Sequence, residues 1–95
     1  MGVGDGDVTR VVAATDMLAV VGGYTHLEQH DRIWVGRCPF DGEATPSFCV
    51  NPREGKYVCF GCQINGDVVN FVSEIEHLDD DDAIRWLAAR AGIVL

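Results

Sequence analysis

Two short clusters of side chains able to bind a metal mark the middle of the sequence. The first is Cys38-Pro39-Phe40-Asp41 and the second is Cys59-Phe60-Gly61-Cys62, separated by residues 42–58. A gap of two residues lets a tight turn, or knuckle, aim both side chains of a cluster at one ion. Zinc takes four such ligands, and carboxylate oxygen is accepted beside thiolate. We therefore expect one zinc site, with Asp41 standing where Cys or His is usual.

Four cysteines also permit two other arrangements, which are a pair of disulfides and a redox-responsive cluster. The sequence shows no charged segment followed by an apolar run and a cleavage site, so we expect a reducing, cytoplasmic setting rather than a disulfide framework. A redox sensor would release its zinc on oxidation, and Cys49 near the clusters is the specific support for it. A structural metal is favoured because 95 residues bury only a thin core.

The charge is unevenly distributed along the chain. The net charge is −8, from fifteen acidic and seven basic side chains, which repels a polyanion at long range. Residues 28–62 hold four basic and five acidic side chains, whereas residues 63–95 hold two basic and seven acidic ones. The middle of the chain is therefore the better candidate for contact with nucleic acid. The longest apolar stretches are far too short to span a bilayer.

The first half of the chain predicts helices and then a hairpin. Residues 1–6 are Gly-rich and are expected to be a disordered lead, followed by a single domain over residues 7–95. Two short helices begin near Asp7 and Asp16 and end at Gly22-Gly23. Residues 24–27 and 33–35 favour strands, joined by a polar turn over residues 28–32.

The second half predicts another hairpin and then two helices. Residues 48–50 and 56–58 favour antiparallel strands around the turn at residues 51–55, which delivers Cys59. Asn65-Gly66-Asp67 ends the knuckle and caps a helix with apolar residues at Val68, Phe71, Val72 and Ile75. A last helix starts within residues 79–82 and ends before Gly92. The expected fold is α+β, with a small antiparallel sheet flanked by N-terminal and C-terminal helices.

The order of these motifs resembles a known family. Cys38-Pro39-Phe40, Thr45-Pro46-Ser47-Phe48, Cys59-Phe60-Gly61-Cys62 and Gly66-Asp67-Val68 occur together in the N-terminal zinc-binding domain of bacterial and phage DnaG-type primases, a CHC2-type zinc finger. The resemblance implies a zinc-ribbon-type sheet, a Zn²⁺ ion, contact with single-stranded DNA template, and help to a catalytic core that starts an RNA primer. That core is a separate Toprim domain, and its motifs are missing here, so the chain alone is not expected to catalyse.

One position departs from the family pattern. The family's first knuckle reads Cys-Pro-Phe-His, and Asp41 replaces the His. We favour Cys38, Asp41, Cys59 and Cys62 as the ligand set, because the position and reach of Asp41 are suitable. Water, His30 or Cys49 are the alternatives for the fourth ligand. Cys49 is otherwise expected to be a half-buried small apolar side chain.

Six side chains near the clusters are candidates for DNA contact. Arg37, Arg53 and Lys56 could bind phosphates, and Trp34, Tyr57 and Phe60 could stack on unpaired bases. The ordinary alternative is that the aromatic rings build a core and the basic groups are solvated. Strand alternation puts Lys56 and Val58 on one face and Tyr57 on the other, and the resemblance places template contacts on the face away from the helices.

A second class of function stays open. The acidic helices could dock on a primase core or a replicative helicase, so that the chain works as a protein-interaction module and never touches DNA. The net charge of −8 motivates this alternative. Charge reversal at Lys56 and Arg37 distinguishes the two, because an interaction module that uses its acidic helices would be indifferent to it.

Overall fold

The computed structural model describes residues 4–40 and 47–95. The chain divides into two compact units, one of which spans residues 16–68 and contains the whole sheet. The other combines the N-terminal residues up to Thr15 with residues 69–95 and is helical. We call them the sheet unit and the helical unit. The expectation of a single domain over residues 7–95 stays a prediction.

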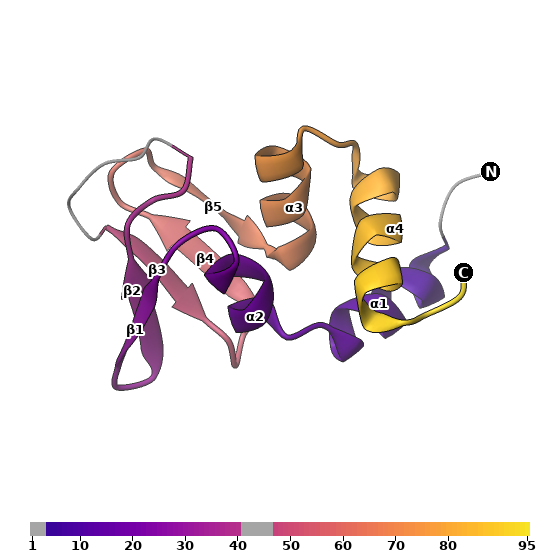
Figure 1. Ribbon diagram of the computed structural model, residues 1–95, viewed down its shortest axis with the longest axis horizontal. Helices are drawn as coiled ribbons and strands as arrows, with labels where there is room; N and C mark the ends of the chain where they lie inside the picture. Colours follow the sequence, from indigo (N-terminus) through magenta and orange to yellow (C-terminus); the bar gives the residue numbers. More distant parts are fainter. Residues whose placement is uncertain (1–3, 41–46) are drawn as a thin grey trace. The chain divides into compact units, whose positions relative to one another are not determined.

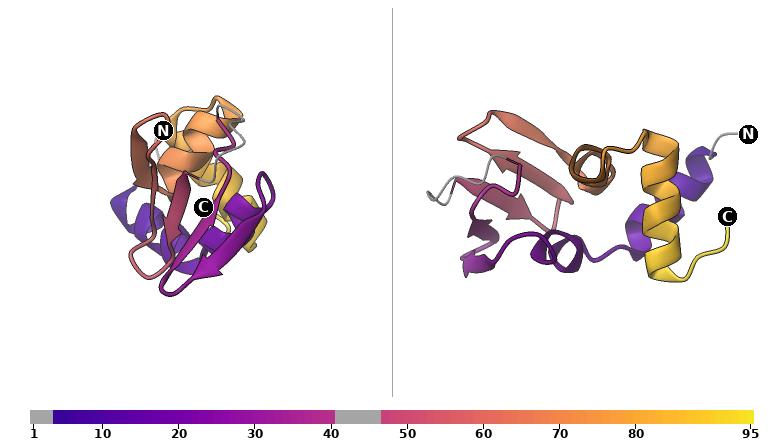
Figure 2. Two further views of the ribbon diagram at one scale, coloured as in Figure 1. Left: turned by 90° about the vertical axis from the view of Figure 1, so that its left-hand side faces the viewer. Right: turned by 45° about the horizontal axis from the view of Figure 1, so that its top comes forward.

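The sheet unit is built on five antiparallel strands that follow one another across the sheet in sequence order (Figures 1 and 2). Each strand is four residues long, so two residues of each strand lie on either face. The antiparallel sheet and the hairpin between the two knuckles, predicted from the sequence, are confirmed. The strands are β1 (Leu27–His30), β2 (Ile33–Gly36), β3 (Phe48–Asn51), β4 (Lys56–Cys59) and β5 (Ile64–Asp67).

The first strand lies further along the chain than expected. The predicted hairpin with residues 33–35 is confirmed, but of its predicted first strand over residues 24–27 only Leu27 belongs to β1. The amides of Tyr24 and Thr25 instead donate to the carbonyl of Val21 and close the end of the preceding helix. β1 instead runs through the polar residues 27–30, most of which are exposed on this edge strand. Asp31 takes a φ of 61°, which lets a two-residue turn replace the longer predicted one.

The fifth strand was not predicted at all. Residues 64–67 read as a turn and cap from the sequence, but they pair with β4, with Tyr57 opposite Gly66 and Cys59 opposite Ile64. Asn, Gly and Asp have low strand propensity, and pairing with an already ordered neighbour overrides that preference. β5 thus closes the second knuckle between two paired strands.

The two faces of the sheet differ in burial. One face, the Tyr57 face, carries Phe48, Val50, Tyr57 and Cys59, all of them buried. The rings of Phe48 and Tyr57 stack with centroids 5.4 Å apart. Helix α2 (Met17–Gly22), which Asp16 caps by accepting from the amides of residues 18 and 19, adds three further buried side chains to this unit. They are Met17, Val20 and Val21.

The opposite face, the Lys56 face, is more exposed. Alternation along β3 and β4 places Lys56 beside Asn51, and Val58 beside Cys49. Val35 follows on β2, directly opposite Cys49. Lys56 is exposed and the other four are half-buried.

The helical unit contains α1 (Asp5–Ala14), nearly all of α3 (Val68–Glu76) and α4 (Asp80–Ala91). Helices α1 and α4, from opposite ends of the sequence, lie side by side (Figures 1 and 2). The guanidinium of Arg10 donates to the carbonyl of Val94 at 3.1 Å. Of the expected disordered lead over residues 1–6, Gly4 is the N-cap of α1, Asp5 and Gly6 form its first turn, and residues 1–3 lie outside the described part.

The last helix starts and ends where the sequence predicts. The carboxylate of Asp79 accepts from the amide of Asp82 at 2.8 Å, and Gly92 ends the helix with a φ of 73°. Three acidic residues in the first turn and Arg90 in the last complement the helix dipole. No helix in the described ranges combines the length and the apolar composition needed to cross a membrane. The buried side chains of this unit are Val11, Val69, Phe71, Val72, Ala83, Ile84, Leu87 and Ala88.

Candidate metal centre

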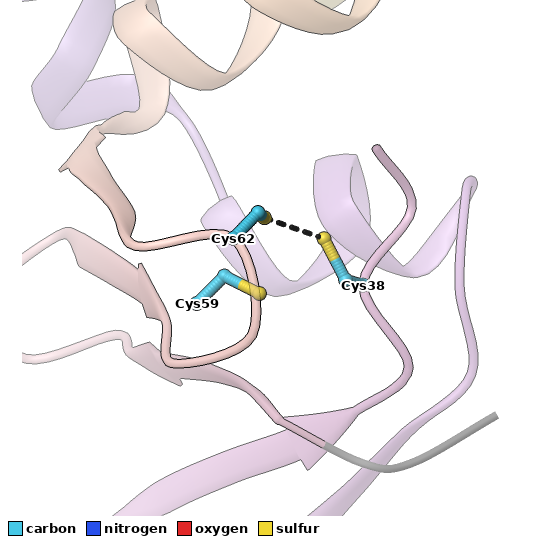
Figure 3. Close-up of side chains that lie close together, drawn as sticks. All are labelled: Cys38, Cys59 and Cys62. Carbon is cyan, nitrogen blue, oxygen red and sulfur yellow. Dashed lines mark hydrogen bonds between the residues drawn. The ribbon is translucent and has the colours of Figure 1, made fainter. Parts of the chain in front are cut away.

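Three cysteine thiols meet at one end of the sheet. Cys38 lies two residues after β2, Cys59 is the last residue of β4, and Cys62 lies in the turn between β4 and β5. Their sulfur atoms all lie within 4.8 Å of one another, and the Sγ atoms of Cys38 and Cys62 are 3.3 Å apart. In Figure 3 the three side chains point toward a common centre. The two knuckles therefore converge as their spacing predicts.

The second knuckle is held by strand pairing on both sides. The amide of Phe60 donates to the carbonyl of Ser47 at 3.0 Å, which extends the β3–β4 ladder one step beyond Cys59. Gln63 takes a φ of 59°, and this left-handed conformation turns the chain back into β5. The hydroxyl of Ser47 lies 3.7 Å from the sulfur of Cys59. Sequence reasoning missed this role of Ser47, whose signal is its place one residue before β3.

The first knuckle follows from a close approach between β1 and β2. Gly36 is buried opposite Leu27, and a Cβ atom at Gly36 would collide with the carbonyl oxygen of His26. The hydroxyl of Thr25 donates to the carbonyl of Arg37 at 2.8 Å, one residue before Cys38. These contacts set the direction in which Cys38 enters the site. The expected fourth ligand, Asp41, lies outside the described residues.

The three thiols share hydrogen bonds that separate their acidities. Burial, together with hydrogen bonds to Cys59 and Cys38, raises the pKa of Cys62 to about 12. Burial acts in the same direction on Cys59, but hydrogen bonds from the Cys62 amide, both other thiols and the Ser47 hydroxyl outweigh it, so its pKa is lowered. Cys59 is thus more acidic than Cys62, and the other two thiols donate to it. Such a donor set deprotonates fully only when a cation replaces the protons.

The cluster fits a soft, four-coordinate metal ion. A tetrahedral site with Zn–S bonds of about 2.3 Å has sulfur atoms about 3.8 Å apart, close to the spacings observed here. All four cysteines of the chain are free thiols, and Cys38 and Cys59 are buried. Thiolate ligands favour zinc over hard cations such as magnesium. These three cysteines can supply three of four ligands.

Cys49 and His30, the alternatives for the fourth ligand, do not join the cluster found among the described residues. Cys49 lies on the Lys56 face, opposite Val58, whereas Cys59 lies on the other face of the sheet. Burial raises the pKa of the Cys49 thiol, and the charge of Cys59 adds to the effect. Cys49 is half-buried, in agreement with the small apolar role expected for it.

The six candidates for DNA contact are spread over different parts of the sheet unit. Arg37, Arg53 and Lys56 are exposed, and Phe60 is 70% exposed. Tyr57 is only 3% exposed and packs on Phe48, so its ring is closed to a nucleic-acid base, and the expectation that it stacks on one is not supported. Trp34 is half-buried and lies on the same face as Tyr57, through the pairing of both with Val50.

Comparison with known proteins gives one consistent result. The family model described as the CHC2 zinc finger matches residues 4–95. A DNA primase of Treponema pallidum is 45% identical over 86 residues, which are 90% of this chain and 14% of that protein. A DNA primase of Streptomyces coelicolor is 43% identical over 94 residues, which are 98% of this chain and 15% of that protein.

A solved structure agrees with these relatives. The crystal structure of the Aquifex aeolicus primase, with its zinc-binding and RNA polymerase domains, superposes with a TM-score of 0.86. It is 35% identical, and the match covers 94% of this chain and 22% of that one. The fold and the cysteine cluster define a zinc-ribbon-type metal-binding domain. The chain belongs to the CHC2 zinc-finger family of DnaG-type DNA primases, and it spans about a seventh of the length of the curated relatives that it matches.

Proposed function

We propose that this chain is the part of a DnaG-type primase that contacts single-stranded DNA template and helps the catalytic core to start an RNA primer. The observation that carries the proposal is the convergence of three thiols from two knuckles within 4.8 Å, in a chain whose relatives are DNA primases. Zn²⁺ is the proposed ion, bound by Cys38, Cys59, Cys62 and Asp41. The catalytic core acts in cis or in trans, with a replicative helicase as a further partner.

The proposed role of zinc is structural. Its described ligands come from the start of the β2–β3 connection (Cys38), the end of β4 (Cys59) and the turn after β4 (Cys62), so the ion joins segments that are distant in sequence. Binding energy of this kind becomes folding free energy, because the ligands converge only in the folded chain. The sheet that presents Lys56 and Phe60 then depends on the metal.

The fourth ligand can be tested by substitution at Asp41. Asp41→Ala is expected to weaken zinc retention against a competing chelator, because three thiolates and a water bind less tightly than four protein ligands. Asp41→His, which restores the usual family residue, is the matched variant and is expected to retain zinc at least as well as the unchanged chain. Equal retention in all three proteins would remove Asp41 from the site.

The proposed DNA contacts are Lys56, Arg37, Arg53 and Phe60. All four are exposed, and Lys56 lies on the sheet face that carries the fewest buried side chains. The basic groups would neutralise phosphates, so binding is expected to weaken as salt rises. Tyr57 is left out of the proposal because its ring is buried.

The experiment that tests the function is primer synthesis by the cognate catalytic core, with this chain supplied in trans at low salt. We expect template-directed RNA synthesis to be stimulated by the zinc-loaded chain and not by Cys59→Ala. Cys49→Ala is the matched control, because Cys49 is outside the cluster. Absence of stimulation by a zinc-loaded chain, together with no binding to single-stranded DNA, would contradict the proposal.

The competing proposal is an interaction module that docks through its acidic helices. It is favoured by the exposed acidic first turn of α4, where Asp80 and Asp82 face solvent. Reversal of charge at Lys56 and Arg37 separates the two functions. Loss of priming in that double variant supports template contact, whereas unchanged priming, with loss on neutralising Asp80 and Asp82, supports docking.

A further inference from the structure

A hydroxyl group lies next to the metal cluster. Ser47 Oγ is 3.7 Å from the Sγ atom of Cys59, and the two atoms are hydrogen-bonded. Regular alternation would turn Ser47 toward the Lys56 face, because its neighbour Phe48 points to the Tyr57 face. β3 begins only at Phe48, however, and the hydroxyl instead lies at the sulfur of Cys59, which belongs to the Tyr57 face. This departure from alternation brings Ser47 to the metal cluster.

The backbone of Ser47 is held by the sheet. Its carbonyl accepts from the amide of Phe60 at 3.0 Å, one step beyond the pair formed by Phe48 and Cys59. The hydroxyl and the sulfur thus belong to two adjacent, paired segments of the chain. Ser47 is half-buried and Cys59 is 0% exposed. Because solvent does not reach the sulfur, a surface water molecule is not available to replace the hydroxyl as a donor.

The direction of this hydrogen bond is set when Cys59 binds a metal ion. A thiol and a hydroxyl can each donate, but a thiolate has no proton, so Ser47 must then be the donor. The sulfur of Cys59 also accepts from the Cys62 amide and from the thiols of Cys38 and Cys62. Those two thiols lose their protons when they bind the same ion. The Ser47 hydroxyl and the Cys62 amide are the donors of that set that remain.

We propose that Ser47 is a positioning residue of the metal centre, whose hydroxyl donates to the Cys59 thiolate and slows the loss of the ion. The inference rests on the proposed function, because it requires Zn²⁺ on these cysteines. Three thiolates around a divalent cation leave an excess of negative charge, and a carboxylate as the fourth ligand increases it. Hydrogen bonds from neighbouring groups stabilise such a buried anion. A donor at Cys59 therefore stabilises this sulfur as a ligand.

The matched pair Ser47→Thr and Ser47→Val tests the hydroxyl. The two new side chains have nearly the same shape, and only threonine carries a hydroxyl, so a difference between the variants reports the hydrogen bond. We expect the zinc-loaded Ser47→Thr chain to retain its ion like the unchanged chain in competition with a chelator. The Ser47→Val chain should hold zinc about 10-fold more weakly, the low end of the effect of losing an outer-shell partner. Equal loss of zinc in both variants would overturn the proposal, because the shape of the side chain would then matter and not its hydroxyl.

A spectroscopic measurement distinguishes a hydrogen-bond donor from a residue that only shapes the site. Co²⁺ in place of zinc gives a charge-transfer band whose energy depends on the electron density of the sulfur ligands. Loss of a donor raises the energy of the sulfur electrons, so the band of the Ser47→Val chain should shift to longer wavelength. The ligand-field bands should keep their tetrahedral pattern, and Ser47→Thr should show no shift. A changed ligand-field pattern without that shift would overturn the proposal, because Ser47 would then act on the geometry alone.

Ser73→Ala is the control for the loss of a hydroxyl as such. The hydroxyl of Ser73 donates to the carbonyl of Leu78 at 2.6 Å, within the helical unit. Its removal should leave zinc retention and the cobalt spectrum unchanged. Unchanged retention and an unchanged spectrum in the Ser47→Val chain as well would overturn the role of Ser47 alone. Failure of the unchanged chain to take up either metal would instead overturn the proposed function, and this inference with it.

Discussion

The two units of this chain are stabilised by different means. The helical unit buries eight aliphatic or aromatic side chains from three helices, and its last helix has a polar cap at one end and a glycine cap at the other. The sheet unit is made of four-residue strands, and two of its buried side chains are cysteines of the metal cluster. From this comparison we expect apolar burial to support the first unit by itself, whereas we expect the second unit to need a bound metal in addition. Removal of the metal should therefore leave the helical unit folded, and truncation of the apolar core of the helical unit should leave the sheet unit folded.

Removal of the metal is the largest expected perturbation. Stripping zinc with a chelator, or substituting Cys59→Ala, should cost the sheet unit about 10 kcal/mol or more, the scale of metal binding in small zinc domains. Amide hydrogen exchange should show loss of protection in β3 and β4 while α4 keeps its protection. Cys49→Ala serves as the control. Retained protection throughout the sheet in the metal-free chain would refute the dependence on metal.

Truncation of the apolar core should act on the helical unit. Leu87 is 1% exposed in the middle of α4. Leu87→Ala removes buried methyl groups and leaves a cavity, so we expect a loss of about 2–5 kcal/mol in the free energy of unfolding. Thermal unfolding followed by circular dichroism measures it. Zinc content should be unchanged, and a substoichiometric content would show that the two sources of stability are not separate.

A smaller effect is expected at the close approach of β1 and β2. In Gly36→Ala, the new methyl group meets a backbone carbonyl oxygen, which cannot rotate away as a flexible side chain could. β1 must shift, and we expect a cost of about 1–3 kcal/mol, as for overpacking elsewhere. Denaturant unfolding of the zinc-loaded chain checks this. Gly22→Ala, which adds a methyl group where no atom lies within 4 Å, is the control for a glycine substitution as such.

The smallest expected effect concerns a cap in the helical unit. Asp79→Ala removes the carboxylate that accepts the Asp82 amide, and the typical cost is about 1 kcal/mol. The same substitution at Asp80, inside the first turn, removes a charge but no cap, and should cost less. A comparison of melting temperatures between the two variants measures the difference. Equal melting temperatures would mean that the helix dipole, and not the hydrogen bond, carries the effect.

The sequence predicted those parts of the molecule in which local pattern and tertiary structure agree. Asp79 and Gly92 indicate the start and the end of the last helix. The turn residues and the strand-forming residues between the knuckles indicate the hairpin there. The convergence of Cys38, Cys59 and Cys62 followed from spacing, because a metal ion imposes a short distance on residues far apart in the chain. The metal ion requires particular spacings between the cysteines along the chain, and these spacings can be read directly from the sequence.

The rest depended on contacts that sequence does not display. β5 contains Asn65, Gly66 and Asp67 and becomes a strand only because β4 offers free backbone groups for pairing. The role of Ser47 follows from the ladder register, which places it against Phe60. Tyr57 is buried because its face of the sheet packs in the core. Alternation along the strand predicts only that Tyr57 and Lys56 lie on opposite faces, and it does not predict which of the two faces is buried.

The strand order has a kinetic consequence. Every strand pairs with its neighbour in sequence, so each hairpin closes only the connection between two consecutive strands, which is two to four residues long except for the eleven residues between β2 and β3. Cys59 and Cys62 are brought together by one such local event, whereas Cys38 and Cys62 are 24 residues apart and meet only after three hairpins are in register. Because loop closure is entropically cheaper for short loops, the ion should load first on the second knuckle and recruit the first knuckle afterwards. Strand pairing and metal binding would then proceed in one direction, from the second knuckle at the end of β4 to Cys38 in the first knuckle.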